Sequence, residues 1–289
     1  MSTSIWFATA HMQLTGNIPL LNVEPFAAAG FEVHAMGPGA GQPIVNALLQ
    51  GRAEYCNVLA LPIMRATQGQ GLKFICSYQP TGWELWARPD IKSLKDLAGR
   101  HLALTSPMAR SYLDDGLREA GVDPASVVEG IGIQLDGAGV EQLRRGAADA
   151  AILMPPVTVM AQSLGLHRLA HLGQWGQPVA YGLMTTDRML AERRDEVVRF
   201  VRALLASVRA LKADRELALR LTRAQGLPEE FVADTVDITL SQLDADGYLP
   251  EAAQRRWIDT AANFLGMTET VPLSRVFDFS VLNDAHRGA

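Results

Sequence analysis

The first half of the chain alternates short apolar runs with helical patterns. Apolar, β-branched and aromatic side chains concentrate in four runs, which predict strands over residues 4–8, 31–35, 55–59 and 73–77. Helical spacing in the intervening segments predicts helices over residues 18–29, 43–50 and 62–68. Strand–helix alternation is typical of an α/β protein whose parallel strands are joined by right-handed crossovers. We therefore expect a parallel sheet covered by helices.

The same pattern then begins again. Strands are predicted over residues 100–105, 130–135 and 150–153, and helices over 106–120 and 140–145. A Gly-Ala-Gly turn precedes a helical segment and an acidic residue in both halves, at residues 39–54 and 137–149. Two copies are too few for a solenoid, so the repeat predicts two similar α/β lobes. From residue 187 onward, amphipathic spacing predicts a helical C-terminal third.

Length and charge narrow the class of protein. With 289 residues, 48% of them hydrophobic and 20% charged, the chain has the composition of a globular protein of about two domains. Its net charge of −5 disfavours nucleic acid and anionic membrane surfaces as partners. The arginine pairs at 144–145, 193–194 and 255–256 stand among acidic residues and predict solvated helix faces.

The number and spacing of the cysteines and histidines predict no metal site, and we expect no cofactor. Cys56 and Cys76 are too few for a disulfide framework or a cysteine metal site, and His167 and His171 have no third ligand near them in sequence. The first seven residues carry no leader pattern, and no apolar run reaches the roughly 20 residues of a membrane helix. As written, the chain is expected to be cytoplasmic, or periplasmic if a leader has been trimmed.

Several motifs together resemble a known family. They are residues 18–21 (IPLL), 46–54 (NALLQGRAE), 91–100 (IKSLKDLAGR) and 148–152 (ADAAI). In their order, these motifs resemble the type 2 periplasmic-binding-protein fold, in the nitrate, taurine and alkanesulfonate branch that includes proteins for thiamine pyrimidine precursors. Many relatives have a tryptophan-glutamate pair before the proline where this chain has Met154-Pro155, which removes a polar ligand contact.

The resemblance implies two similar α/β lobes with a ligand cleft between them. One lobe would comprise residues 1–86 plus 188–289 and the other residues 87–187. The implied function is a solute-binding protein that closes around a small organic ligand, anionic or heteroaromatic, for an ABC-type importer. Its expected partners are that ligand and the importer's membrane subunit, and the chain is expected to be a monomer or a weak dimer.

Candidate site residues follow from a rule that holds for open α/β sheets, in which ligands bind beyond the carboxyl ends of the strands. The candidate ligand contacts at those positions are His11, Gln13, Gly39, Gly41, Gln42, Cys56, Asn57, Trp83, Ser106, Arg110, Ser111, Pro155 and Tyr181. Ser106 is a good N-cap, and a helix N-terminus beside Arg110 favours an acidic group. Trp83 and Tyr181 would stack on a ring or serve as core aromatics.

An enzyme on the same scaffold is the alternative. It would be a decarboxylase, desulfinase or lyase acting on a small aromatic acid, with Cys56 as nucleophile and His11 as its base. The absence of a leader favours this alternative. The absence of a recognisable acid–base pair or metal cluster favours binding without catalysis, which we prefer. A ligand-sensing regulator is disfavoured because no DNA-binding segment accompanies the lobes.

Overall fold

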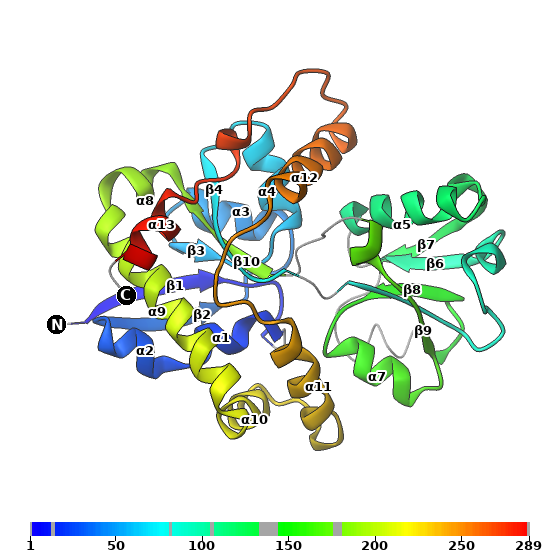
Figure 1. Cartoon of the computed structure of the whole chain (residues 1–289), viewed down its shortest axis with the longest axis horizontal. Coiled ribbons are helices and arrows are strands. Elements are labelled where there is room, and N and C mark those ends of the chain that lie inside the picture. The colour runs from blue at the N-terminus through cyan, green and yellow to red at the C-terminus, as the bar shows by residue number, and fades with distance from the viewer. Residues whose placement is uncertain are drawn as a thin grey trace. The chain divides into compact units, whose positions relative to one another are not determined.

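A computed structural model describes residues 2–12, 15–80, 83–104, 107–132, 144–175 and 181–287. These residues form two compact units (Figure 1). Unit 1 comprises Met1–Pro80 and Val179–Ala289, and unit 2 comprises Thr81–Pro178.

The sheet of unit 1, sheet A, has five strands in the order β2-β1-β3-β10-β4. Their bounds are β1 Thr3–Ala8, β2 Phe31–Met36, β3 Tyr55–Cys56, β4 Leu72–Gln79 and β10 Tyr181–Thr186. Strand β1 pairs in parallel with β2 and β3, whereas β10 runs antiparallel to both β3 and β4. The prediction of a parallel sheet is therefore wrong, because β10, which follows the whole of unit 2 in the chain, is inserted between β3 and β4.

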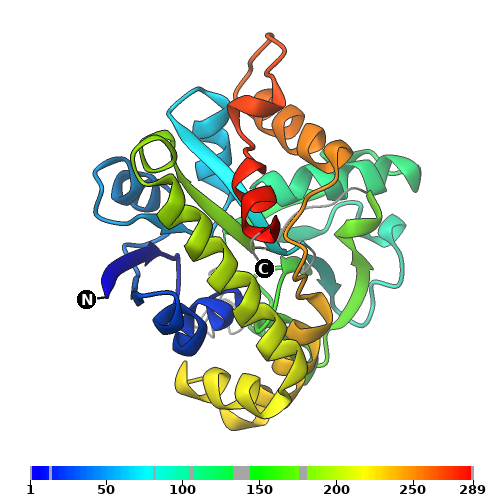
Figure 2. The same cartoon turned by 60° about the vertical axis from the view of Figure 1, so that its left-hand side comes forward.

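Helices cover both faces of sheet A. Those of unit 1 are α1 Ile18–Leu21, α2 Val23–Ala28, α3 Gln42–Leu49, α4 Ala60–Thr67, α8 Asp187–Glu192, α9 Arg194–Ala213, α10 Arg215–Ala224, α11 Glu229–Gln242, α12 Glu251–Phe264 and α13 Ser280–Arg287. Helix α9 packs against α2 and α13, as Figure 2 shows, while α3 and α4 pack together and α12 contacts α4. The helical C-terminal third predicted from the sequence is confirmed.

The helix predicted over residues 18–29 is divided in two. Asn22 separates α1 from α2 with extended backbone angles, φ −76° and ψ 90°. Pro25 explains the break, since proline has no N–H to donate to the carbonyl of Leu21 and its ring collides with that carbonyl in a continuous helix.

An aromatic cluster anchors α9 to the sheet. The ring of Phe200 stacks on Tyr55 with centroids 4.2 Å apart and lies 5.0 Å from Phe26 and 5.6 Å from Phe31. All four side chains are 3% exposed or less. Burying such rings contributes about 1.5–3 kcal/mol each, so this cluster is a principal source of stability in unit 1.

Unit 2 repeats the strand order of unit 1. Its sheet, sheet B, has the order β7-β6-β8-β5-β9, with β5 Glu84–Ala87, β6 His101–Leu104, β7 Val128–Gly132, β8 Ala150–Leu153 and β9 His167–His171. Strand β6 is parallel to β7 and β8, and β5 is antiparallel to β8 and β9. In each unit the antiparallel strand is fourth in the order. The two-lobed α/β class predicted from the sequence repeat is confirmed.

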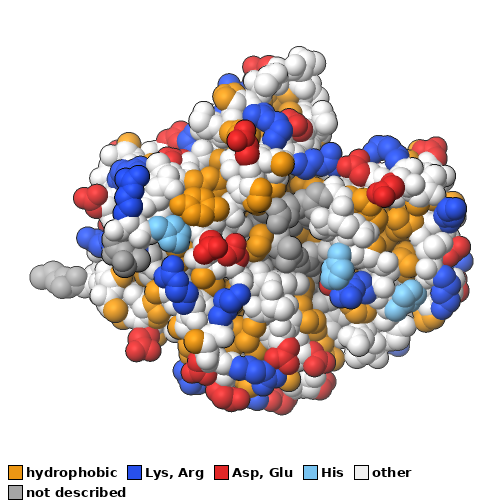
Figure 3. All heavy atoms as spheres, viewed as in Figure 1, with side chains coloured by type: hydrophobic (Ala, Val, Ile, Leu, Met, Phe, Trp, Pro, Cys, Tyr) orange, Lys and Arg blue, Asp and Glu red, His pale blue; other side chains and the backbone are white. Residues whose placement is uncertain are grey.

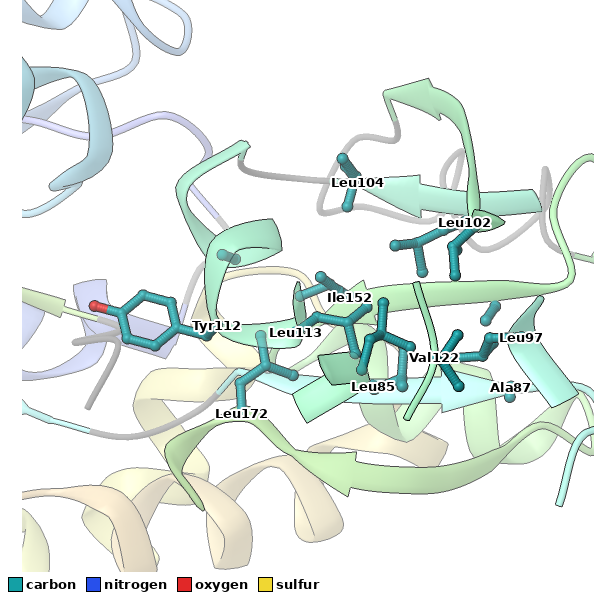
Figure 4. Close-up of a cluster of buried hydrophobic side chains, with 14 of the residues drawn as sticks. Leu85, Ala87, Leu97, Leu102, Leu104, Tyr112, Leu113, Val122, Ile152 and Leu172 are labelled. Atoms are coloured by element: carbon teal, nitrogen blue, oxygen red, sulfur yellow. The ribbon is translucent and has the colours of Figure 1, made fainter. Parts of the chain in front are cut away.

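The core of unit 2 lies between sheet B and α5 Pro107–Glu119. Figure 4 shows Leu113 of α5 near Ile152 of β8 and Leu85 of β5, and the same buried cluster includes Tyr112 and Leu102. Helix α7 Val157–Ser163 contacts β5 and β9 on the other side of the sheet (Figure 1). The helix predicted over residues 140–145 falls largely outside the described residues.

A strand follows each of the two junctions along the chain, β5 in unit 2 and β10 in unit 1. Strand β5 pairs within sheet B and β10 within sheet A, although neither was predicted as a strand from the sequence. The lobe boundaries after residues 86 and 187 remain a proposal. Within the ranges described, no helix is long and apolar enough to cross a membrane.

Charged side chains of both signs are intermixed on the face of the molecule shown in Figure 3. Two of the paired arginines illustrate the pattern, because Arg193 is bonded to Glu196 and Glu54, and Arg194 to Asp284. At these positions basic side chains are balanced by nearby carboxylates.

Candidate functional site

The carboxyl edge of sheet A gathers loops from distant parts of the chain. Strands β1, β2, β3 and β4 end at this edge, and the antiparallel strand β10 begins there with Tyr181. Ligands of open α/β sheets bind beyond the carboxyl ends of the strands, so the residues that follow these strand ends are the candidate ligand contacts.

The loop after β1 is held by two buried asparagines. Asn17 donates from Nδ2 to the carbonyl oxygens of His11 and Met12, at 2.9 and 3.0 Å. Asn57 donates from Nδ2 to Asn17 Oδ1 at 2.8 Å. Both asparagines are fully buried. Asn57, predicted as a ligand contact, therefore supports the loop that carries His11.

Two buried tyrosines also contact the backbone of this loop. Tyr78 donates its hydroxyl hydrogen to the carbonyl oxygen of Gly16 at 2.9 Å. A Cβ atom on Gly16 would lie 2.2 Å from the ring of Tyr181, whose hydroxyl is hydrogen-bonded to Thr15. Burial raises the pKa of both tyrosines, so both remain neutral. Tyr181 thus packs against the loop backbone. Of the two roles that the sequence allowed, stacking on a ligand or packing in the core, this position is that of a core aromatic.

Among the described residues of this loop, Ala10, His11 and Met12 remain accessible. His11 is half-buried, and 41% of Met12 is exposed. Gln13 lies outside the described residues. In the described part of the loop, the buried network therefore presents the polar side chain of His11 at the carboxyl edge.

Cys56 is the last residue of β3 and is fully buried. Burial raises the pKa of its thiol to about 12. Sγ donates to the carbonyl oxygen of Val58 at 3.5 Å. A nucleophilic cysteine depends on its thiolate, which is scarcely populated at neutral pH in this environment.

The glycine turn after β2 leads into α3. Gly39 and Gly41 have positive φ angles of 98° and 75°, which glycine adopts without strain. Gln42 follows as an exposed side chain that donates to Asn46 Oδ1 at 2.9 Å and accepts from Arg65 at 3.0 Å. These three candidates form the entrance to α3, as the sequence predicts.

In unit 2 the candidates near α5 have partners of their own. Arg110 donates from Nε to Asp114 Oδ1 at 2.6 Å and from Nη2 to the carbonyl oxygen of Pro124 at 2.8 Å. Ser111 is its half-buried neighbour on α5, and Ser106 lies outside the described residues. Trp83 packs against the core of unit 2, and Pro155 is buried after the end of β8.

A group that the sequence did not suggest lies at the start of β5. The Glu84 cluster consists of Glu84, Trp86, Arg168 and His171. Trp86 donates from Nε1 to Glu84 Oε2 at 2.7 Å. Arg168 Nη1 and His171 Nδ1 lie 3.3 and 3.2 Å from Glu84 Oε1. The Glu84 side chain is 6% exposed, whereas Arg168 and His171 are 50% and 55% exposed.

Strand register places Glu84 and His171 at the carboxyl edge of sheet B, whereas Trp86 and Arg168 pair with one another nearer the opposite end of β5 and β9. Glu84 pairs with Leu153, the last residue of β8, and with His171, the last residue of β9. His167 pairs with Ala87 at the opposite end of β9, so the two histidines lie four residues apart on a strand rather than on one helix face. No group of three metal-ligating side chains occurs among the residues that the structure describes.

Comparison with known proteins identifies the family. Residues 26–218 match the family model described as NMT1/THI5 like. The chain belongs to the NMT1/THI5-like family. No curated protein matches it significantly. The resemblance of the motifs to the nitrate, taurine and sulfonate branch of the type 2 periplasmic-binding-protein fold is confirmed.

Solved structures with the same fold include proteins that are named as binding proteins and one that is named as an enzyme. The ligand-binding component of an ABC-type import system from Staphylococcus aureus, with zinc bound, has a TM-score of 0.75 at 13% identity, covering 98% of this chain and 99% of its own. The periplasmic aliphatic sulphonate binding protein SsuA from Escherichia coli has a TM-score of 0.74 at 15% identity, covering 95% and 91%.

A third similar structure is named as an enzyme. The desulfurization enzyme DSZB has a TM-score of 0.67 at 15% identity, covering 99% of both chains. At these identities the likeness shows the fold alone, so this NMT1/THI5-like chain shares its architecture with binding proteins and with an enzyme. The chemistry of its own residues has to decide between the two functions.

Proposed function

We propose that this chain is a solute-binding protein that takes a small acidic organic ligand and delivers it to an ABC-type importer. Membership of the NMT1/THI5-like family supports a binding protein. The names of the S. aureus and E. coli proteins support an importer component and an acidic ligand. The proposal places the chain in the periplasm, the location given in the name of the E. coli protein.

The observation that carries the proposal is the set of buried hydrogen bonds that hold the described residues after β1, at His11, Met12, Gly16 and Asn17. Buried side chains from β4 and from the segment after β3 hold their backbone through the Gly16 carbonyl and the Asn17 side chain. Residues whose backbone is held in place before the ligand arrives lose little conformational entropy on binding, which favours tight and reversible association. The candidate contacts on this loop are His11 and Gln13.

The alternative function is an enzyme with Cys56 as nucleophile, and its support is the likeness to DSZB. The protonated state of Cys56 argues against this alternative, because a buried thiol with a pKa of about 12 would need a base or cation beside it. We therefore propose that Cys56 contributes shape and apolar area to the edge of the sheet.

The test is to titrate the purified protein with ethanesulfonate, taurine, benzoate and benzenesulfinate by isothermal calorimetry, and to analyse each mixture by mass spectrometry. We expect saturable binding of at least one acid, with the acid recovered unchanged. Cys56→Ser should bind the same acid within about threefold, since a thiol at this position contributes little beyond its volume. Turnover that the wild type shows and Cys56→Ser loses would establish the enzyme instead.

A further inference from the structure

The two edge strands of sheet A, β2 and β4, differ in how their outer backbone groups are used. Those of β4 bond to segments from the C-terminal third, where Phe74 N donates to the carbonyl oxygen of Val276 and Ser77 N to that of Gly247, both at 2.7 Å. In the part of the chain that the structure describes, β2 pairs with β1 alone. The edge at β4 is therefore filled by the chain itself, whereas the edge at β2 is open.

The register of β2 on β1 determines which backbone groups face outward. In this parallel ladder Thr9 N donates to the carbonyl oxygen of Met36 at 3.0 Å, so the even-numbered residues of β2 bond to β1. The N–H and C=O groups of Phe31, Val33 and Ala35 consequently point away from the sheet. Strand β2 contains no proline, lysine or bulge, the features that commonly protect an edge strand from pairing.

Apolar side chains flank this open edge on both faces of the sheet. On one face, Trp6 of β1 is 40% exposed and stacks on His34 of β2, with ring centroids 4.7 Å apart. On the opposite face, which carries Phe31, helix α2 packs against β2 and its residue Val23 is 63% exposed. A strand that pairs with β2 would therefore have apolar neighbours on each side.

The side chains of β2 match those of a second copy of the same strand. Glu32 and His34 lie on one face, with Oε1 and Nε2 3.5 Å apart. Two copies related by a two-fold axis through Val33 pair antiparallel, so that Phe31 of each bonds Ala35 of the other and Glu32 lies opposite His34. An axis through Glu32 or His34 would instead place that residue opposite itself. The register centred on Val33 is thus the one that pairs the acid with the imidazole.

We propose that β2 is a homodimer interface, in which the β2 strands of two copies pair antiparallel about an axis at Val33. The two five-stranded sheets then form one continuous sheet. The outward backbone groups of Phe31, Val33 and Ala35 become paired, and each Glu32 carboxylate accepts a hydrogen bond from His34 of the other copy. The inference is independent of the proposed function, because no residue of β2 is a candidate ligand contact.

Sedimentation velocity on the full chain, over a range of protein concentrations, tests the dimer. We expect the wild type to reach twice the 31.3 kDa mass of one chain. His34→Glu places like charges opposite one another at two positions and should weaken dimerisation by about tenfold or more. Gln162→Glu adds the same charge at an exposed position of α7 and should leave the dimer unchanged.

A mixing experiment tests the register. In a mixed dimer of His34→Glu and Glu32→Lys chains, the introduced lysine faces the introduced glutamate, and the remaining histidine faces the remaining glutamate. The mixture should therefore dimerise more tightly than His34→Glu alone. A mixture that is no tighter overturns the proposed register.

Amide hydrogen exchange followed by NMR measures the backbone pairing directly. The amides of Val33 and Ala35 should exchange slowly in the wild-type dimer and rapidly in His34→Glu. Those of Glu32 and Met36 bond to β1 and should stay protected in both proteins, which also shows that the variant is folded. A monomeric wild type, or a dimer in which the Val33 and Ala35 amides exchange freely, overturns this inference and leaves the proposed function standing.

Discussion

The side chains of Asn57 and Asn17 meet at 2.8 Å with no exposed surface on either residue. They lie 40 positions apart in sequence, and their hydrogen bond joins the segment after β3 to the loop after β1. The position of His11 at the carboxyl edge depends on this bond, because Asn17 holds the carbonyl groups of His11 and Met12.

Removing the Asn57 amide should therefore destabilise the protein. Asn57→Ala leaves Asn17 Oδ1 buried without its donor, which costs about 1–3 kcal/mol of unfolding free energy. Gln42→Ala is the matched control, because Gln42 and Asn46 form the same kind of amide pair on the surface; it should cost less than about 0.5 kcal/mol. Urea denaturation followed by circular dichroism measures both, and equal losses would contradict the role of the buried pair.

The close approach of Gly16 to Tyr181 gives a second prediction. Gly16→Ala places a methyl group 2.2 Å from the Tyr181 ring, and the overpacking should cost about 1–3 kcal/mol. Gly37→Ala is the control, since a Cβ there meets nothing within 4 Å.

The double variant Gly16→Ala/Tyr181→Leu isolates the contact itself. If the methyl group collides with the ring, the two losses should be non-additive by about 1 kcal/mol or more in a double-mutant cycle. Additive losses measured by thermal or urea unfolding would show that the ring is not the cause.

The buried thiol of Cys56 predicts how stability depends on alkaline pH. Its pKa is raised on folding from 9.0 to about 12, so the folded state keeps a proton that the unfolded state loses. The contribution to stability is complete below about pH 9 and is lost progressively as the pH rises toward 12. Cys56→Ala should make the decline shallower by at most about 1.4 kcal/mol per pH unit. Identical slopes for wild type and variant between pH 9 and 11 would contradict the raised pKa.

Arg110 provides a prediction on unit 2. Its guanidinium is 13% exposed and bonds Asp114 and the Pro124 carbonyl, so Arg110→Ala should lower the unfolding free energy by about 1–3 kcal/mol. The control is Arg118→Ala on the same helix, whose ion pair with Asp115 is exposed and contributes less than about 1 kcal/mol. An affinity for acids that falls without any loss of stability would assign Arg110 to the ligand instead.

Local sequence patterns were sufficient for much of the fold. The alternation of apolar runs and helical spacing predicted β1, β2, β4, β6 and β8 together with α3, α4 and α5, since periodicity reflects which side chains are buried along a single element. The repeated Gly-Ala-Gly turn and the helix after it predicted two similar units, and strand order confirms them. His11 and Cys56 were selected as candidates because they lie at the carboxyl ends of predicted strands, where ligands bind in open α/β sheets.

Tertiary pairing decided the rest. Strands β5 and β10 are four and six residues long, and their places come from partners elsewhere in the chain, which no local pattern encodes. Glu84 meets His171 only because β5 and β9 pair in that register across 87 positions of sequence. The sequence by itself determined most of the segments that form strands and helices, because periodicity along a single element reflects its burial. Long-range pairing determined which polar side chains came together, because those contacts depend on the register between segments and on burial.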